Sequence, residues 1–250
     1  MKAPAEAQLR LLDVQRIDSR ADQLRHQRAS LPEIAEIATL TAGREEVNDQ
    51  RRDQQVVVDD LTAAQRKADV DVEQVKARRT RDNDRMAQGL VTNPKDLERM
   101  QHELASLERR IGTLEDEELE IMEQLEEAQA RLDELEQKLT GSDERLAELA
   151  VQRDEKTAII DHELAALETE RGPAAEGLPA DLVALYDKLR SSKNGVGAAE
   201  LRQRRCTGCQ IGIDNAEIGV IRATPEDTVV RCEECSRILV RTAESGLTVS

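Results

Sequence analysis

Four cysteines form two close pairs near the end of this 250-residue chain. Cys206 and Cys209 enclose a Thr-Gly dipeptide, and Cys232 and Cys235 enclose two glutamates. Two intervening residues let a tight turn direct both thiolates at one ion, and the roughly 22 residues between the pairs are close to a zinc-ribbon spacing. Four thiolates leave no open coordination position, so the sequence predicts one structural zinc ion. The alternatives, reduced structural thiols or a redox pair, do not require two matched pairs.

Short apolar segments flank both pairs and predict the strands that position them: residues 201–205, 228–231 and 237–240. We expect a zinc-ribbon domain over residues 196–250, preceded by a short helix and linker over 173–195. A domain of this size buries too little apolar surface to fold alone. Metal binding, worth about 10–16 kcal/mol in comparable peptides, would supply the missing free energy of folding.

The composition points to long helices for the rest of the chain. There is no Phe or Trp, only one Tyr, and 35% of residues are charged, which is typical of a core extended along one dimension. The net charge of −16 disfavours a non-specific nucleic-acid coat. No apolar run reaches the roughly 20 residues of a membrane span, and the N-terminus is unlike a secretory signal. Paired cysteines in such a chain favour a reducing, cytoplasmic location, with no membrane partner.

Residues 97–149 carry an apolar seam with the 3.5-residue repeat of a coiled coil. Only Glu118 and Ser142 interrupt it. Its members are Leu97, Met100, Leu104, Leu107, Ile111, Leu114, Ile121, Leu125, Ala128, Leu132, Leu135, Leu139, Leu146 and Leu149.

A weaker seam precedes it, and a turn signal separates the two. Gly89 suits a helix C-terminus, while Asn93 and Pro94 suit the start of the next helix. The two helices should therefore fold back on each other, with Leu61 opposite Ile121. A shift of one heptad would match the seams equally well, and only the positions of the Gly and Pro signals select this register. In this arrangement Val57 lies opposite Leu125. The predicted members of the first seam are Leu40, Gly43, Val47, Gln50, Gln54, Val57, Leu61, Ala64, Ala68, Asp71 and Val75.

The predicted fold class is thus mostly α: a long antiparallel coiled-coil hairpin over residues 1–172, with its tip near 89–94, followed by the small β zinc ribbon. Pro32 should break the first helix, and Gly172-Pro173 should end the last one. An intrachain hairpin and a helical dimer use the same kind of seam, so the oligomeric state stays open.

The chain resembles the bacterial four-cysteine zinc-ribbon proteins in which the ribbon follows a long helical hairpin. The resemblance rests on the ribbon (residues 206–239), the tip sequence 93–97, the helix 182–189 and the N-terminal segment 11–18. Some members act as adaptors or chaperones for an alternative sigma factor and for secretion components, and one binds a flagellin messenger RNA. The chain departs from the family at Ser236, where Gly is usual, and at Val240, where Tyr is usual.

The favoured function is a non-enzymatic adaptor or scaffold for protein partners, with a role in transcription or its regulation implied by the resemblance. No catalytic constellation is present: His26, His102 and His162 are scattered along helical segments, where solvated histidines are common. The hairpin tip is locally basic and could contact an acidic partner, or could simply be a solvated helix end. Its basic residues are Lys76, Arg78, Arg79, Arg81, Arg85, Lys95 and Arg99.

The alternative function is nucleic-acid binding by the zinc ribbon. Strands would place several arginines on one face, where they could contact phosphates. An ordinary charged surface is the other interpretation, and base stacking is disfavoured because no aromatic residue lies in the ribbon. The candidate contacts are Arg202, Arg204, Arg205, Arg231, Arg237 and Arg241.

Overall fold

The computed structural model describes residues 1–247, so the last three residues of the predicted ribbon domain lie outside the described residues. The chain divides into two compact units, Met1–Ile34 with Val151–Ser250, and Ala35–Ala150. Its elements are α1 (Ala5–Ala29), α2 (Pro32–Ala87), α3 (Pro94–Ala175), α4 (Ala180–Ser192), β1 (Ala198–Arg202), β2 (Arg205–Cys206), α5 (Asn215–Ala223), β3 (Val230–Arg231) and β4 (Ile238–Arg241).

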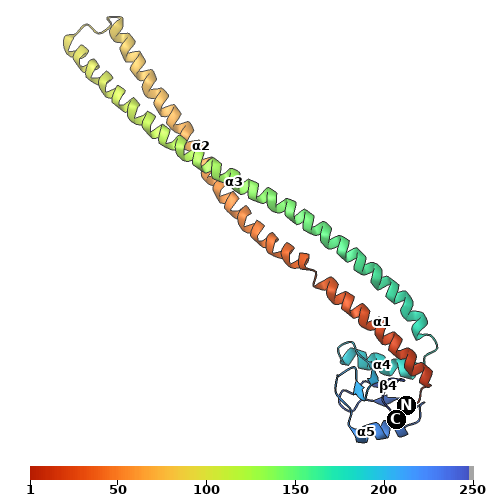
Figure 1. The fold of residues 1–250 in the computed structure, drawn as a ribbon. Helices are drawn as coiled ribbons and strands as arrows, with labels where there is room; N and C mark the ends of the chain where they lie inside the picture. Colours follow the sequence, from red (N-terminus) through yellow and green to blue (C-terminus); the bar gives the residue numbers. More distant parts are fainter. Residues whose placement is uncertain (248–250) are drawn as a thin grey trace. The chain divides into compact units, whose positions relative to one another are not determined.

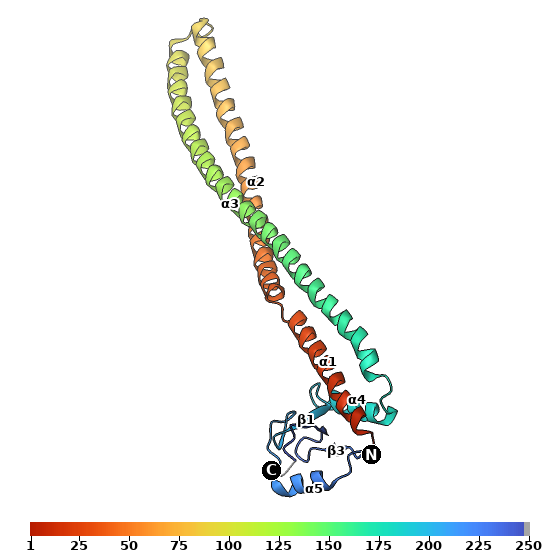
Figure 2. The same ribbon diagram turned by 45° about the vertical axis from the view of Figure 1, so that its right-hand side comes forward.

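The unit formed by residues 35–150 is an antiparallel helical hairpin, in which α2 and α3 run side by side (Figures 1 and 2). The predicted seam of α3 is confirmed over most of its length. Its inward positions are buried or half-buried, whereas Leu97 at the tip is exposed. The buried members are Ile111, Leu114, Ala128, Leu132, Leu135 and Leu149.

The predicted seam of α2 is correct at most positions, which are half-buried, and wrong by one residue at Gly43, Gln50 and Val57, which are exposed. Val58 is 6% exposed and Val72 is buried, whereas the predicted Val57 is 44% exposed. Half-buried Arg44 and Arg51 take the places assigned to Gly43 and Gln50. Long polar side chains can cover a seam with their aliphatic stems while their polar ends reach water, so hydrophobicity alone selects the wrong line.

Contacts across the hairpin fix its register. Gln54 Nε2 donates to the carbonyl of Ala128 at 3.0 Å, which places these two turns together as the predicted register requires. Val58 packs with Ala128 and Leu132 in one apolar cluster. The Lys76 ammonium lies 2.8 Å from Glu115 at the edge of the seam.

The predicted break between the first two helices is confirmed, but the predicted end of α3 is not. α1 ends at Ala29 and α2 begins at Pro32, as predicted. The predicted end at Gly172-Pro173 is wrong, because α3 continues to Ala175 with Pro173 in its last turn. Arg10 of α1 donates to the carbonyl of Glu176 at 2.5 Å and also bonds the carbonyls of residues 173 and 174. These bonds satisfy carbonyls that a helix end leaves unpaired.

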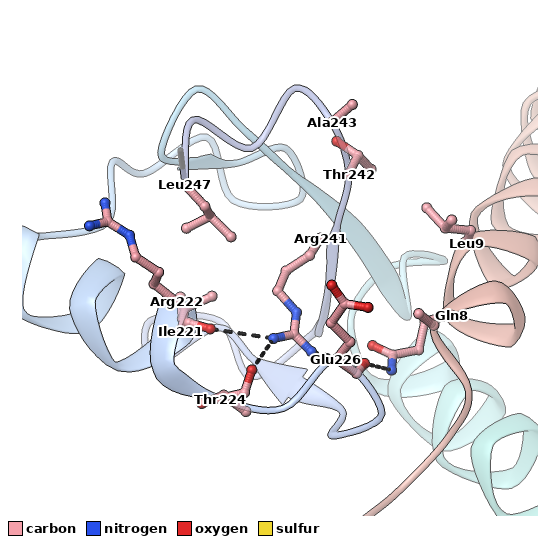
Figure 3. A pocket seen from close by; sticks show the side chains of 11 residues that line it. Gln8, Leu9, Ile221, Arg222, Thr224, Glu226, Arg241, Thr242, Ala243 and Leu247 are labelled. Carbon is pink, nitrogen blue, oxygen red and sulfur yellow. Dashed lines mark hydrogen bonds between the residues drawn. The ribbon is translucent and has the colours of Figure 1, made fainter. Parts of the chain in front are cut away.

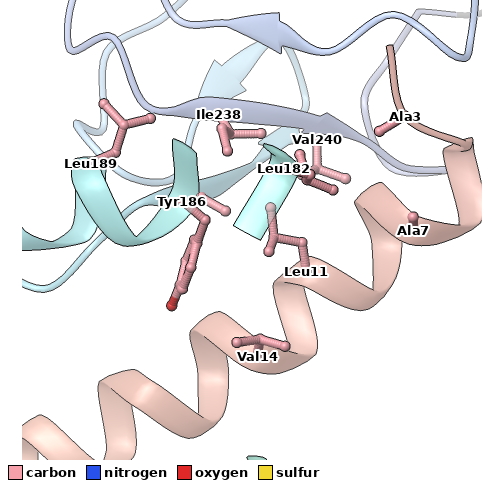
Figure 4. Close-up of a cluster of buried hydrophobic side chains, with 10 residues drawn as sticks. Ala3, Ala7, Leu11, Val14, Leu182, Tyr186, Leu189, Ile238 and Val240 are labelled. Carbon is pink, nitrogen blue, oxygen red and sulfur yellow. The ribbon is translucent and has the colours of Figure 1, made fainter. Parts of the chain in front are cut away.

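The other unit is built around an apolar core that α1, α4 and the ribbon share. Figure 4 shows Leu11 and Val14 of α1 close to Tyr186 of α4, below the strand that carries Ile238 and Val240. Because these residues are buried together, the ribbon folds against the helices.

A buried carboxylate ties three helices together beside that core. Asp18 of α1 accepts from Arg171 Nε of α3 and from the Tyr186 hydroxyl of α4, both at 2.8 Å, and Arg190 Nε lies 3.5 Å away. Burial, followed by the bond to Asp18, raises the pKa of Tyr186, so its hydroxyl stays a donor. A buried charge with several partners of this kind fixes how the helices are arranged.

The ribbon sheet has the strand order β2-β1-β4-β3. β1 pairs antiparallel with β2 and parallel with β4, and β3 pairs antiparallel with β4. The N-terminus pairs with the segment just before β3, because Ala3 N–H donates to the carbonyl of Asp227 and Lys2 forms an isolated antiparallel β-bridge with Thr228. Strands near 201–205, 228–231 and 237–240 were predicted. The sequence analysis did not predict α5 as a helix.

Candidate metal centre

The four cysteine sulfurs lie within 4.8 Å of one another. Cys206 Sγ is 3.9 Å from Cys235 Sγ, and Cys209 Sγ is 3.9 Å from Cys232 Sγ. A tetrahedral ion with Zn–S bonds of about 2.3 Å holds its sulfurs about 3.8 Å apart. The donor set and its spacing therefore fit a four-thiolate metal site, as the sequence predicted. All four thiols are free cysteines.

Two similar turns hold the thiols. In the first, Gln210 N–H donates to the carbonyl of Cys206, and in the second Ser236 N–H donates to the carbonyl of Cys232, each at 2.8 Å. Both residues that follow the pairs have left-handed backbone, with φ of 63° at Gln210 and 62° at Ser236. This explains why glycine suits the position of Ser236.

The surroundings of three of the thiols shift their pKa values in different directions. Burial raises the pKa of Cys206 and raises that of Cys232 to about 12. Burial acts in the same direction on Cys235, but hydrogen bonds with the backbone and side chain of Arg237 outweigh it and lower the pKa to about 7. A metal that binds here must therefore displace protons from the more buried thiols.

Two buried glutamines of α1 attach the ribbon to the helices, and sequence reasoning missed both. Gln15 Oε1 accepts from the N–H of Gly197 at 2.7 Å, and its Nε2 donates to Gly195 at 2.9 Å. Gln8 Nε2 donates to the carbonyls of Ala3 and Glu226. Their only signal in the sequence was that Gln15 lies within the N-terminal segment that carries the family resemblance.

The helix α5 could have been found from its capping residues. Asp214 accepts a 2.8 Å hydrogen bond from the N–H of Glu217, which is the first half of a capping box. Ile218 and Ile221 then face the cysteines in one buried cluster with Leu201.

Two of the six ribbon arginines are half-buried and bonded to several backbone carbonyls of this unit. Arg237 donates to the carbonyls of Val196 and Lys193, each at 2.9 Å. Arg241 forms part of the wall of a cavity of about 500 Å³, where Figure 3 shows its guanidinium bonded to the carbonyls of Ile221 and Thr224. It also donates to the carbonyls of residues 225, 226 and 228. These contacts give both arginines a structural role.

The other four arginines are exposed. Arg202 and Arg205 flank the two-residue turn that joins β1 and β2, and Arg204 lies within it with φ of 62°. Arg202 pairs with Glu244 at 2.7 Å, and Arg231 donates to the carbonyl of Ser236. Three exposed arginines thus lie in or beside one turn of the ribbon, where Arg204 donates to Gly246 and Asn215 and Arg205 donates to Gln210.

The basic residues predicted at the hairpin tip divide into two groups. One group forms ion pairs with carboxylates of the hairpin. These pairs are Lys76 with Glu115, Arg78 with Asp82 and Glu103, Arg79 with Glu108, and Arg99 with Asp96. Arg81, Arg85 and Lys95 are exposed, and none of them forms an ion pair within residues 1–247.

Comparison with protein families assigns the chain to a family. Residues 14–194 match the model of the CT398-like coiled coil hairpin domain, and residues 205–239 match that of the C4-type zinc ribbon domain. The chain belongs to the CT398-like hairpin family. The resemblance stated from the sequence is thereby confirmed.

Relatives and solved structures agree with this assignment. An uncharacterized protein of Mycobacterium tuberculosis is 33% identical over 241 residues, which cover 96% of this chain and 98% of the relative. A solved structure from Mycobacterium smegmatis is 34% identical, with a TM-score of 0.84 over 96% of this chain and 100% of that one. CT398 from Chlamydia trachomatis shares the fold, at 18% identity and a TM-score of 0.69 over 95% and 98%.

No helix within residues 1–247 is both long enough and apolar enough to span a membrane.

Proposed function

We propose that this member of the family is a non-enzymatic adaptor that presents a zinc-stabilised ribbon and a coiled-coil hairpin to protein partners. The four close thiols support the zinc. Four thiolates complete a tetrahedron and leave no position for a reacting water, so the ion is structural. Metal analysis of the purified chain should give one zinc per chain, and two or none would contradict this part of the proposal.

The exposed residues of the hairpin tip are the main support for an adaptor function. Leu90 is 65% exposed in the loop between α2 and α3, and Leu97 is exposed one turn into α3. Arg81, Arg85 and Lys95 lie beside this loop in the sequence and keep their charges unpaired within the described chain. Exposed apolar residues among unpaired cations favour a partner surface that is apolar and acidic.

The experiment compares tip variants of the full chain. A variant with Arg81→Glu, Arg85→Glu and Lys95→Glu repels the proposed acidic surface. The matched control reverses Arg109, Arg131 and Lys138, three exposed basic residues of α3 further from the tip. Affinity capture with mass spectrometry should recover proteins with the wild type and the control that the tip variant loses.

The affinity of each chain for one purified partner from that set is then measured. The tip variant should bind this partner about tenfold more weakly than the wild type or worse, because like charges meet where opposite charges met. Because some family members bind an alternative sigma factor, a sigma factor is the first purified protein to test. An identical set of captured proteins for all three chains would contradict a contact at the tip.

Nucleic-acid binding by the ribbon is the second candidate, and the three exposed arginines around the β1–β2 turn favour it. Contacts of this kind weaken steeply with added salt. We expect the double variant Arg204→Ala, Arg205→Ala to reduce binding of RNA or DNA in a filter assay at low salt. No binding by the wild type at low salt would exclude this function.

A further inference from the structure

The face of α2 that is turned away from the seam carries an exposed apolar line. Val56 is 59% exposed and Val70 is 53% exposed, although both lie in the middle of the hairpin. Ala42, Ala63 and Ala77 are also exposed and continue the same line at seven-residue spacing, with Asp49 as its one polar member between them. A helix presents residues seven apart on one side, so these side chains share a face.

The equivalent line of α3 provides an internal comparison. It is also fully exposed, but it is polar or charged at every position except Ala130. The outward face of a helix in this hairpin can therefore be polar, so its solvation does not explain the apolar residues on the outward face of α2. The residues of the α3 line are His102, Arg109, Asp116, Glu123, Ala130, Gln137 and Glu144.

The charges beside the α2 line are arranged symmetrically about Ala63. Asp59 and Asp60 lie one turn before Ala63, and Arg66 and Lys67 lie one turn after it. All four are exposed, and within residues 1–247 Asp60, Arg66 and Lys67 take part in no ion pair. A second α2 laid antiparallel across Ala63 would bring each acidic pair to a basic pair, whereas a parallel α2 would bring like charges together.

We propose that the exposed faces of two α2 helices pack antiparallel to form a two-fold homodimer centred on Ala63. Asp59 then lies near Lys67 of the second copy, Asp60 near its Arg66, and Val56 against its Val70. Each contact occurs twice, as a two-fold interface requires. An open hollow of about 440 Å³, lined by Val70, Ala77 and three polar residues of the same helix, receives Val56 of the second copy.

The first test measures association of the full-length, zinc-loaded chain by sedimentation over a concentration series. We expect a monomer–dimer equilibrium that Val70→Glu weakens about tenfold or more, because the variant buries an unpaired charge. Leu119→Glu is the matched control, since Leu119 is 57% exposed on α3, and it should leave association unchanged.

The second test fixes the direction and register with introduced cysteines. Ala63→Cys should form a disulfide with itself across the two-fold axis. Val56→Cys should link to Val70→Cys in a mixture of the two variants and not to itself. The chain without an added cysteine controls for the four native thiols.

The third test exchanges the charges. Reversal of Asp59 and Asp60 to lysine should weaken association, and adding Arg66→Glu and Lys67→Glu should restore it. A chain that stays monomeric up to several hundred micromolar would overturn the proposal. So would a disulfide between two Val56→Cys chains, or a dimer that Val70→Glu does not weaken.

Discussion

Ser236 closes the second cysteine turn in a conformation that glycine adopts more easily. Its φ is 62°, and for a residue with a side chain the left-handed region costs about 1–2 kcal/mol. Its N–H donates to the carbonyl of Cys232, and the chain adopts the positive φ as it leaves this turn. The strain is therefore a local cost that the rest of the ribbon offsets.

We predict that Ser236→Gly stabilises the ribbon by about 0.5–1 kcal/mol, because the relief of strain exceeds the extra chain entropy of glycine. Zinc release followed through a urea titration measures this change. Ser192→Gly is the control, since Ser192 ends α4 with ordinary helical backbone, and it should be neutral or destabilising. Equal effects of the two substitutions would contradict the argument.

Arg241, like Arg237, has a structural role in place of the nucleic-acid contact that the sequence suggested. Its guanidinium donates to five carbonyls between residues 221 and 228, and thereby holds the end of α5 to the segment before β3. A lysine offers a point charge in place of the planar fork, so it would leave several carbonyls unpaired. The exposed Arg205 makes one such bond, to Gln210.

We predict that Arg241→Lys destabilises the ribbon by about 2–3 kcal/mol and that Arg205→Lys changes its stability by less than about 1 kcal/mol. The urea concentration at which zinc is released gives both values. If Arg241 were a surface contact, the two substitutions would have similar small effects.

At the residue scale, the sequence predicted the groups whose chemistry depends on spacing and missed those whose role depends on burial. The four cysteines were found because two turns and one ion impose a fixed pattern. Gln15 and Arg241 look like ordinary polar residues in the sequence. Their side chains bond to backbone groups that are distant in the sequence, and no local sequence pattern predicts such bonds.

At the scale of elements, Glu118 shows how a polar residue can occupy a coiled-coil seam. It lies at an inward position of α3 and is half-buried. A hydrogen bond with Asp69 of α2, together with burial and repulsion between the two carboxyls, raises the pKa of Glu118 above its usual value. The folded hairpin therefore binds a proton at Glu118 more tightly than the unfolded chain does.

The sign of the pH effect follows from that direction. A raised folded-state pKa gives stability that is fully present below the unfolded pKa of about 4.3 and is lost as pH rises through the folded pKa. We predict that Glu118→Gln raises the midpoint of thermal unfolding of the hairpin at pH 7 and reduces the fall of that midpoint as pH rises above the unfolded pKa. Helical circular dichroism measures both. Glu120→Gln, at an exposed position on the same helix, should change neither.

The seam of α2 was only partly predictable because its sequence fits two lines that are one residue apart. Val57 fits one line and Val58 the other, and the choice depends on whether Gly43 or Arg44 faces the partner helix. Side-chain volume favours the arginine, which packs its stem over the seam. The seam of α3 had no such competitor, because acidic residues separate its leucines.

At the scale of the whole molecule, the two compact units are stabilised in different ways. The unit of residues 35–150 depends on one extended seam, most of whose α2 positions are half-buried. The unit that contains the ribbon joins the cysteine cluster to a core shared with α1 and α4, through Ala198, Ile238 and Val240. Zinc should therefore matter to the helices that contribute to this core and not to the hairpin between residues 35 and 150.

We predict that removing zinc with a strong chelator raises amide hydrogen exchange across residues 198–241 and, to a smaller extent, in α1 and α4, because loss of the sheet exposes Leu11 and Tyr186. Exchange around Val58 and Leu132 should stay unchanged, since no ribbon residue contributes to their cluster. Cys232→Ser should reproduce the pattern without a chelator and keep most of the helical circular dichroism. If the hairpin loses protection together with the ribbon, the two units fold as one, and zinc supports the entire chain.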